Sequence, residues 1–341
     1  MKNRVYIKSL ISGVIIAFLL TFIQLPFYVT KPGLAQDLAP IVEVEGGYEE
    51  AGSLMLTTVR MGKASIFSYL LAKVSDYQKI YPVDAFRKED ESEEEYMYRQ
   101  LHMMEGSQES AISVAYTRAQ KQINYEYNGI YVMSIVANMP SEKELKIGDR
   151  IFQVDGSELK TAEEFIDYVS SKKSGDLIQL ILERKGEVID ASIPLQPFPD
   201  NPEKIGVGIS LVTDREMNVT PKVKIDTEKI GGPSAGLMFS LEIYNQLIEE
   251  DLTKGYEIAG TGTINFAGEV GPIGGIAQKI VAANKAGVQI FFAPNENGSS
   301  ESNYKEALKT VEDINSDMKI VPVDTFDDAV TYLLSDKLKV R

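Results

Sequence analysis

The stretch that decides the fold of this 341-residue chain is GGPSAGLMFSLEIYNQL, residues 231–247. Its glycines and proline predict a tight turn, and the apolar residues that follow at helical spacing predict a helix. Ser234 therefore stands at a helix entrance, where free backbone N–H groups and the helix dipole can stabilise an anion forming nearby. Taken alone, the same hexapeptide also fits a serine that only caps a helix after a Gly-Pro turn.

A second segment, GTGTINFAGEVGPIGGIAQKIVAANKAG, residues 260–287, supplies a candidate base. It predicts a strand, a turn-rich loop and a helix that ends at Gly287. Lys279 lies in this helix beside Ile276 and Ile280, whereas most helical lysines are solvated. A lysine amine acts as a general base only when it is neutral, and an apolar pocket would lower its pKa from about 10.4.

Together the two segments resemble the proteolytic domain of Lon-type serine proteases, which use a Ser/Lys dyad. Residues 233–236 (PSAG) match the nucleophile motif and residues 274–279 (GGIAQK) match the base motif, in the expected order. The resemblance implies that Ser234 is the nucleophile and Lys279 the base, 45 residues apart.

The resemblance also implies supporting roles around the dyad. Thr261 corresponds to a threonine that helps to orient the lysine. The backbone N–H groups of Gly232, Ser234 and Ala235 would hold the oxyanion. One departure concerns Gly231, which stands where many Lon enzymes carry an acidic residue, so no aspartate contribution is available there.

Residues 120–200 predict a small β-rich module that resembles a PDZ domain of the bacterial protease-associated kind. The series GDRIFQVDG, residues 148–156, followed by a helix that begins at Thr161, carries this resemblance. It implies that a peptide adds as an extra strand. The residues expected to bind that peptide are Asn128, Gly129, Ile130, Tyr131 and Val132. A β-rich spacer that binds no ligand is the alternative.

The N-terminus predicts a membrane anchor. Residues 9–30 are 22 consecutive uncharged residues, which as a helix would extend about 33 Å and match a hydrocarbon core of about 30 Å. Lys2, Arg4 and Lys8 precede this run and acidic residues follow it, a bias that keeps the N-terminus in the cytoplasm. The rest of the chain would then lie outside the cytoplasm. A cleaved signal peptide is the alternative.

Composition excludes several kinds of chemistry. The chain has no Cys and a single His, His102, so a thiolate nucleophile and any site that needs two imidazoles are excluded. The net charge of −15 argues against nucleic acid as a partner. No cofactor is expected. The nearest fragment to an ATP-binding P-loop, residues 61–64 (MGKA), lacks the required first glycine and the hydroxyl residue after the lysine.

The sequence thus predicts an α+β multidomain protein in four parts: a cytoplasmic tail and transmembrane anchor (1–31), a strand and helix region packing near the PDZ-like module (32–119), the PDZ-like domain (120–200), and a Lon-type α/β proteolytic domain (205–337). The expected function is that of a single-pass membrane-anchored, ATP-independent serine endopeptidase. It would cleave exported or membrane-attached polypeptides outside the cytoplasm. The sequence leaves open whether the protein assembles into a homo-oligomer. The competing hypothesis is a membrane-tethered scaffold that has lost activity.

Overall fold

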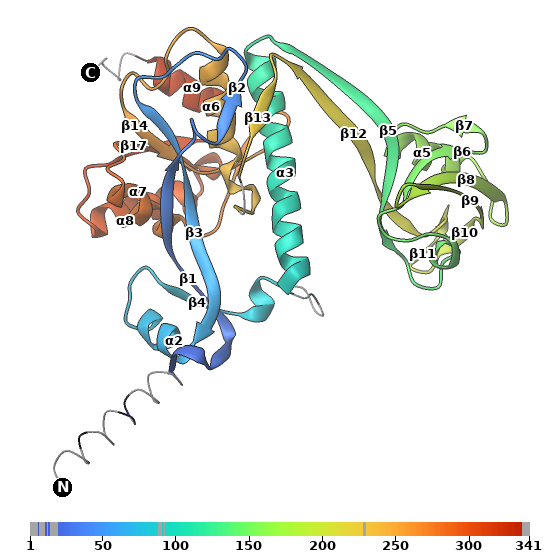
Figure 1. Cartoon of the computed structure of the whole chain (residues 1–341), viewed down its shortest axis with the longest axis horizontal. Coiled ribbons are helices and arrows are strands. Elements are labelled where there is room, and N and C mark those ends of the chain that lie inside the picture. Colours follow the sequence, from blue (N-terminus) through green and yellow to red (C-terminus); the bar gives the residue numbers. More distant parts are fainter. Residues whose placement is uncertain are drawn as a thin grey trace. The chain divides into compact units, whose positions relative to one another are not determined.

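The chain folds into two compact units in the computed structural model, which describes residues 6, 11, 13, 20–87, 91, 93–227 and 230–335. The first unit combines residues 1–122 with 219–341, and the second comprises residues 123–218 (Figure 1). The second unit is therefore an insertion within the first.

This division corrects two of the predicted boundaries. Residues 32–119 were expected to pack near the PDZ-like module, but they belong to the unit that carries Ser234 and Lys279. Residues 205–218 were expected in the proteolytic domain, but they belong to the inserted unit. The reason is strand pairing between segments far apart in the sequence, which no local pattern reveals.

A six-stranded sheet forms the centre of the first unit. Its strand order is β18 (Lys319–Val323), β17 (Ile290–Pro294), β14 (Glu257–Gly260), β3 (Ser53–Ser65), β1 (Gln24–Asp37) and β4 (Lys79–Pro82). From β18 to β3 the neighbours are parallel, whereas β1 pairs antiparallel with both β3 and β4. Strands from before and after the insertion thus share one sheet.

Helices cover this sheet on both faces because side chains alternate along each strand. In β17, Phe291 and Ala293 pack in one core cluster with Ile276 and Ile280 of helix α7 (Ile276–Lys285). Phe292 points the other way, and its ring lies 5.9 Å from that of Tyr332 in α9 (Phe326–Leu334). Apolar contacts with β17 therefore position helix α7, which carries Lys279.

The remaining elements of the first unit connect or flank the sheet. They are β2 (Val42–Val44), α2 (Ile66–Ala72), η1 (Val83–Ala85), α3 (Glu93–Arg118), β13 (Val223–Ile225), η2 (Pro233–Ala235), α6 (Gly236–Leu247), β15 (Thr263–Ile264), β16 (Val270–Gly271), η3 (Glu296–Gly298) and α8 (Asn303–Asp313). Helix α3 packs along α6 and η2.

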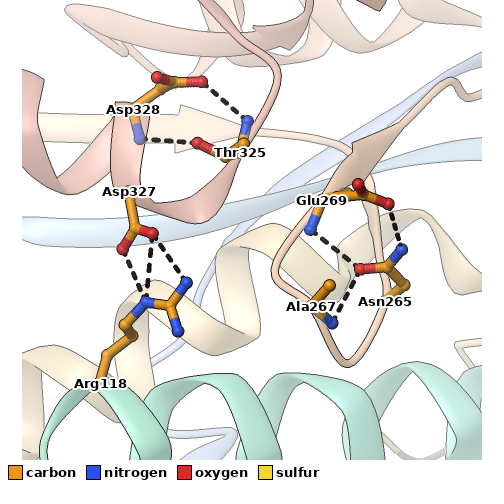
Figure 2. Close-up of polar contacts among 7 residues, drawn as sticks. All are labelled: Arg118, Asn265, Ala267, Glu269, Thr325, Asp327 and Asp328. Atoms are coloured by element: carbon orange, nitrogen blue, oxygen red, sulfur yellow. Dashed lines mark hydrogen bonds and ion pairs between the residues drawn. The ribbon is translucent and has the colours of Figure 1, made fainter.

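Helix α3 is fixed at its C-terminal end by an ion pair. Arg118, its last residue, donates to both carboxylate oxygens of Asp327 in the first turn of α9 (Figure 2). Helix α9 begins where Thr325 and Asp328 form a reciprocal capping box, which satisfies backbone N–H groups that the helix leaves unpaired. The ion pair thereby joins the C-terminal end of α3 to the first turn of α9.

The N-terminal apolar run does not form one helix as far as Thr30. Residues 24–37 are strand β1, which pairs with β3 and β4, so the predicted helix over residues 9–30 is wrong for its last third. The β-branched and aromatic residues of this part favour a strand, and partners on both sides are available. Most of residues 1–19 lie outside the described part. No helix among the described residues has the length and apolar character needed to span a membrane.

The inserted unit is a sheet with the order β12 (Ile209–Thr220), β5 (Gln122–Ile135), β6 (Arg150–Val154), β8 (Leu177–Arg184) and β9 (Glu187–Pro194), with β7 (Ser157–Glu158) beside β6. The shorter elements are α4 (Ser141–Glu144), α5 (Ala162–Ser170), β10 (Gln196–Phe198) and β11 (Asn201–Gly206). The capping box predicted at Thr161 and Glu164 starts α5. Phe165 and Val169 of α5 pack into the core of the unit.

Candidate active site

The nucleophile segment is a tight turn that leads into a buried helix. Gly232 has a φ of 93°, a left-handed conformation that glycine adopts without steric cost. Ser234 then lies in the short helix η2, directly before α6. Helix α6 is almost entirely buried because apolar residues occupy nearly every face. The serine predicted at a helix entrance is confirmed in that place.

The structure brings the predicted dyad together. Lys279 Nζ lies 3.1 Å from Ser234 Oγ, although the two residues come from different helices. The lysine side chain is buried, with 3% of its surface exposed. Serine and base are therefore within hydrogen-bond reach, which is the geometry that proton transfer requires.

Burial also adjusts the charge state of the base. Because its amine is removed from water, the pKa of Lys279 falls from 10.5 to about 7. Ile276 and Ile280, on the same helix, are fully buried. A substantial share of the Lys279 side chains is therefore neutral near neutral pH, as a general base must be.

A second contact holds the lysine, and no pattern in the sequence predicted it. Lys279 Nζ donates to the backbone carbonyl oxygen of Thr57 at 2.7 Å. Thr57 lies in β3, far upstream in the chain, and a backbone carbonyl acts independently of residue type. Only the pairing of β3 with the sheet places this acceptor at the site.

Thr261 acts on the serine rather than on the lysine. Its hydroxyl donates to the carbonyl oxygen of Ser234 at 2.9 Å, and the N–H of Gly262 donates to the same oxygen at 2.9 Å. The orienting role predicted for Thr261 thus shifts from the base to the nucleophile's backbone. Thr261 is fully buried, so water does not compete for this bond.

One of the three predicted oxyanion donors is already engaged. The N–H of Gly232 donates to the backbone carbonyl oxygen of Gln100 in α3 at 2.9 Å. Gly232 therefore does not offer a free donor in this conformation, and that part of the prediction is wrong for the structure described. Ser234 and Ala235 lie at the start of the η2–α6 helical segment, where donors can face a developing oxyanion.

Helix α3 also explains the glycine at position 231. A Cβ added to Gly231 would lie 2.9 Å from the Cβ of Gln100. Close packing of α3 therefore leaves no room for the acidic side chain that many Lon enzymes carry here. Ser107 lies about two turns after Gln100 in α3, and its hydroxyl donates to the carbonyl oxygen of Pro233 at 3.0 Å.

A cleft of about 840 Å³ opens onto the dyad within the first unit. Its walls come from β3, from the loop before α7, from the nucleophile segment and from α3. Apolar side chains dominate the α3 side, where Tyr96, Met97 and Met104 line the cleft. A cleft of this kind suits an extended polypeptide with apolar side chains.

His102, the single histidine, takes no part in the dyad. Its ring lies on the surface of α3, and its Nδ1 is 3.3 Å from a carboxylate oxygen of Glu105. The nucleophile therefore has a lysine as its basic partner.

The peptide-binding strand predicted in the PDZ-like module is wrong. Residues 128–132 lie inside β5, which has β12 on one side and β6 on the other, so this strand offers no free edge there. Gly129 lies within β5 and not in a loop, and a Cβ at this position would lie 2.2 Å from the carbonyl oxygen of Ile151. The sequence prediction missed that a strand from residues 209–220 would pair with β5.

The edge of this sheet beside helix α5 is β12. The hydroxyl of Thr213 in β12 accepts a hydrogen bond from the N–H of Ala162, the first residue of α5, at 3.0 Å. The loop before β12 contains Gly208 with a φ of 89°, and its carbonyl oxygen accepts from the N–H of Val136 at 2.8 Å. An edge strand beside a helix can accept an added strand, so β12 replaces β5 as the candidate.

Comparisons with known proteins agree with both units. Residues 220–336 match the family of the Lon protease (S16) C-terminal proteolytic domain, and residues 102–195 match the PDZ domain family. The PDZ match begins within α3 and ends before β11, whereas the folded unit covers residues 123–218.

Individual relatives match only part of the chain. It is 31% identical over 150 residues to the Lon protease of Metamycoplasma arthritidis, covering 44% of this chain and 17% of that protein. It is 33% identical over 139 residues to the Lon protease of Campylobacter jejuni, covering 38% and 16%. The chain thus spans less than a fifth of the length of these relatives. A PDZ domain of an SdrC-like protein from Listeria monocytogenes is 36% identical, covers 26% of this chain and 90% of that chain, and has a TM-score of 0.24.

The family match and the geometry concern the same residues. Ser234 and Lys279 both fall within residues 220–336, and the structure places their reacting atoms 3.1 Å apart. Residues 220–336, which carry both Ser234 and Lys279, are therefore similar to the proteolytic domain of the Lon protease family, and residues 102–195 are similar to a PDZ domain.

Proposed function

We propose that the protein is an ATP-independent serine endopeptidase, anchored to a membrane by its N-terminal apolar run, that cleaves exported or membrane-attached polypeptides outside the cytoplasm. The observation that carries the proposal is the buried Lys279 amine 3.1 Å from the Ser234 hydroxyl. No cofactor is needed for this chemistry, since the base and the nucleophile are both side chains of the chain.

The dyad supports the following cycle. Neutral Lys279 takes the hydroxyl proton as Ser234 attacks the peptide carbonyl, and the N–H groups at Ser234 and Ala235 hold the oxyanion. Lys279 then gives the proton to the leaving amine. Water attacks the resulting ester, again with Lys279 accepting a proton, and the free serine is restored.

The proposal of ATP independence rests on residues 61–64, the fragment that comes nearest to a P-loop, and on the position of this fragment within a strand. A P-loop cradles phosphates where a strand turns into a helix. Gly62 and Lys63 lie instead within β3, paired with β1. A protease that lacks an unfolding motor can cut only extended or flexible segments, so we expect those to be the substrates.

The PDZ unit is proposed to position such segments at the edge of β12. Replacing residues 123–218 by a short Gly/Ser linker should raise the KM for a protein substrate more than it lowers kcat. An unchanged KM for every substrate tried would remove this role.

The decisive experiment incubates the full-length protein with an unfolded protein and follows cleavage. Ser234→Ala and Lys279→Ala should abolish cleavage. Ser299→Ala and Lys285→Ala, at exposed positions of the same unit, should retain it. Lys279→Arg should also be inactive, because a guanidinium does not deprotonate to serve as a base.

Cleavage by every variant would show that another site is responsible. Cleavage by none, the wild type included, would favour the alternative of a tethered binding protein. Cleavage that stops when ATP is enzymatically removed, or that requires ATP hydrolysis, would contradict ATP independence specifically.

A further inference from the structure

Helix α2 presents its apolar face to the outside. Phe67, Leu70 and Leu71 lie at helical spacing on one face, and Val74 continues this face beyond the last turn. Apolar residues at such spacing normally form the buried stripe of a surface helix. Here they are exposed by 56%, 55%, 44% and 81%.

The opposite side of α2 is the side that packs on the protein. Ala72 is its buried residue, and it joins a small core cluster with Val29 and Ala64 of the central sheet. Tyr69 packs against the same cluster. One face of α2 therefore packs on the protein, while the face formed by Phe67, Leu70 and Leu71 remains exposed to solvent.

This surface is continuous with the end of the N-terminal apolar run. The N–H of Ile66, at the start of α2, donates to the carbonyl oxygen of Ile23 at 3.3 Å. Phe22 and Ile23 are exposed by 66% and 45%. Gln24, the first residue of β1, also pairs with Ser65, directly before α2. Six large apolar side chains thus gather where the apolar run enters the folded unit, and we call these six the α2 patch.

Local charge at the α2 patch differs from that of the whole chain. Residues 60–79 contain Arg60, Lys63, Lys73 and Lys79 against a single acidic residue, Asp76, so their net charge is 4 − 1 = +3 in a chain of −15. Lys63 and Lys79 pair with Glu93 and Glu306 of the same unit, and counting these two carboxylates reduces the local net charge to 3 − 2 = +1. Basic residues around an apolar surface favour anionic lipid headgroups.

We propose that the α2 patch docks on the surface of a lipid bilayer and forms a second membrane contact beside the N-terminal run. An exposed apolar patch of this kind marks an interaction surface. A helix with an apolar face and flanking cations lies in the plane of the membrane interface, with that face among the upper acyl chains. The inference rests on the membrane anchoring proposed above, since that anchoring brings the bilayer to this end of the unit.

Docking at α2 would also define where substrates are cut. Strand β4 and the residues after it lie next to α2, and Tyr81 and Phe86 from this region line the cleft at the dyad. A docked unit would therefore present one end of its cleft to polypeptides near the membrane surface.

The chain has no tryptophan, so one introduced Trp reports alone. Three full-length variants are reconstituted separately into vesicles of phosphatidylcholine and phosphatidylglycerol, with or without brominated acyl chains that quench Trp fluorescence. Phe67→Trp probes the α2 patch, and Phe18→Trp probes the N-terminal run. Leu308→Trp, exposed by 38% on α8, is the control on the same unit.

We expect brominated chains to lower the emission of Phe67→Trp and Phe18→Trp by about twofold or more, and that of Leu308→Trp by less than about a tenth. Quenching of Phe18→Trp with none at Phe67→Trp would overturn the docking of α2 and leave the anchor intact. No quenching at either position would refute both.

Two further outcomes would also overturn the inference. Equal quenching at Leu308→Trp would indicate adsorption of the whole unit rather than docking through α2. A blue-shifted Phe67→Trp spectrum that bromine does not quench would show that a protein surface, such as a second copy of the chain, covers the patch. Circular dichroism of each variant checks that the fold is kept.

Discussion

The pH dependence of cleavage tests the buried lysine directly. The perturbation is a change of pH from 8 to 5.5 in the wild-type protein. If the pKa of Lys279 is about 7, the neutral fraction falls from about nine-tenths to about 3% over this range. Cleavage measured as kcat/KM should therefore drop by about 30-fold, because only the neutral amine accepts the serine proton.

The size of the effect follows from burial. Lowering the pKa from 10.5 to about 7 corresponds to roughly 5 kcal/mol of free energy that favours the neutral amine. With an ordinary pKa, only about one lysine in 3,000 would be neutral at pH 7. The apolar setting of α7 thus raises the share of active base by about three orders of magnitude.

The assay follows a quenched fluorescent peptide at low concentration between pH 5 and 10, with labelling of Ser234 by a fluorophosphonate as a second readout. The rate should rise through pH 7 and then level off. A rate that instead keeps rising about tenfold per pH unit up to pH 10 would show that Lys279 has an ordinary pKa. A rate independent of pH would show that a different group is the base.

Three further changes have defined outcomes. Thr261→Val should lower kcat about fivefold with little change in KM, because it removes about 1 kcal/mol of hydrogen bonding to the Ser234 carbonyl; an unchanged kcat would contradict this role. Burial raises the pKa of Glu242 from 4.5 to about 7, so it binds a proton in the folded but not the unfolded chain between these values, and stability falls as pH rises through them. Relative to the wild type, Glu242→Gln should therefore gain stability in urea unfolding as pH rises from 4.5 to 8, because the variant lacks this linked proton; equal pH dependence of variant and wild type would refute it. Arg184→Ala should destabilise the inserted unit by about 3 kcal/mol, since it leaves the buried carboxylate of Asp149 without its paired cation, and calorimetry should show the loss in that unit alone.

Local patterns in the sequence predicted the dyad and much of its setting. The turn before Ser234, the apolar helix around Lys279 and the capping box at Thr161 are each encoded within about ten residues. Such features depend on backbone preferences and on side-chain spacing, which a single sequence displays. The pairing of Ser234 with Lys279 came from the resemblance to Lon-type proteases, and the structure shows it as a contact.

Only the tertiary structure decided the parts that depend on distant segments. The carbonyl of Thr57 as a partner of Lys279, the engagement of Gly232 by Gln100, and β12 as the neighbour of β5 all join residues far apart in the chain. Residues 24–30 illustrate the same limit, because they are apolar enough for a membrane helix but pair as β1 with β3 and β4. Backbone groups carry no residue-specific signal, and apolar runs suit both strands and helices, so the partner that is available in space decides between them.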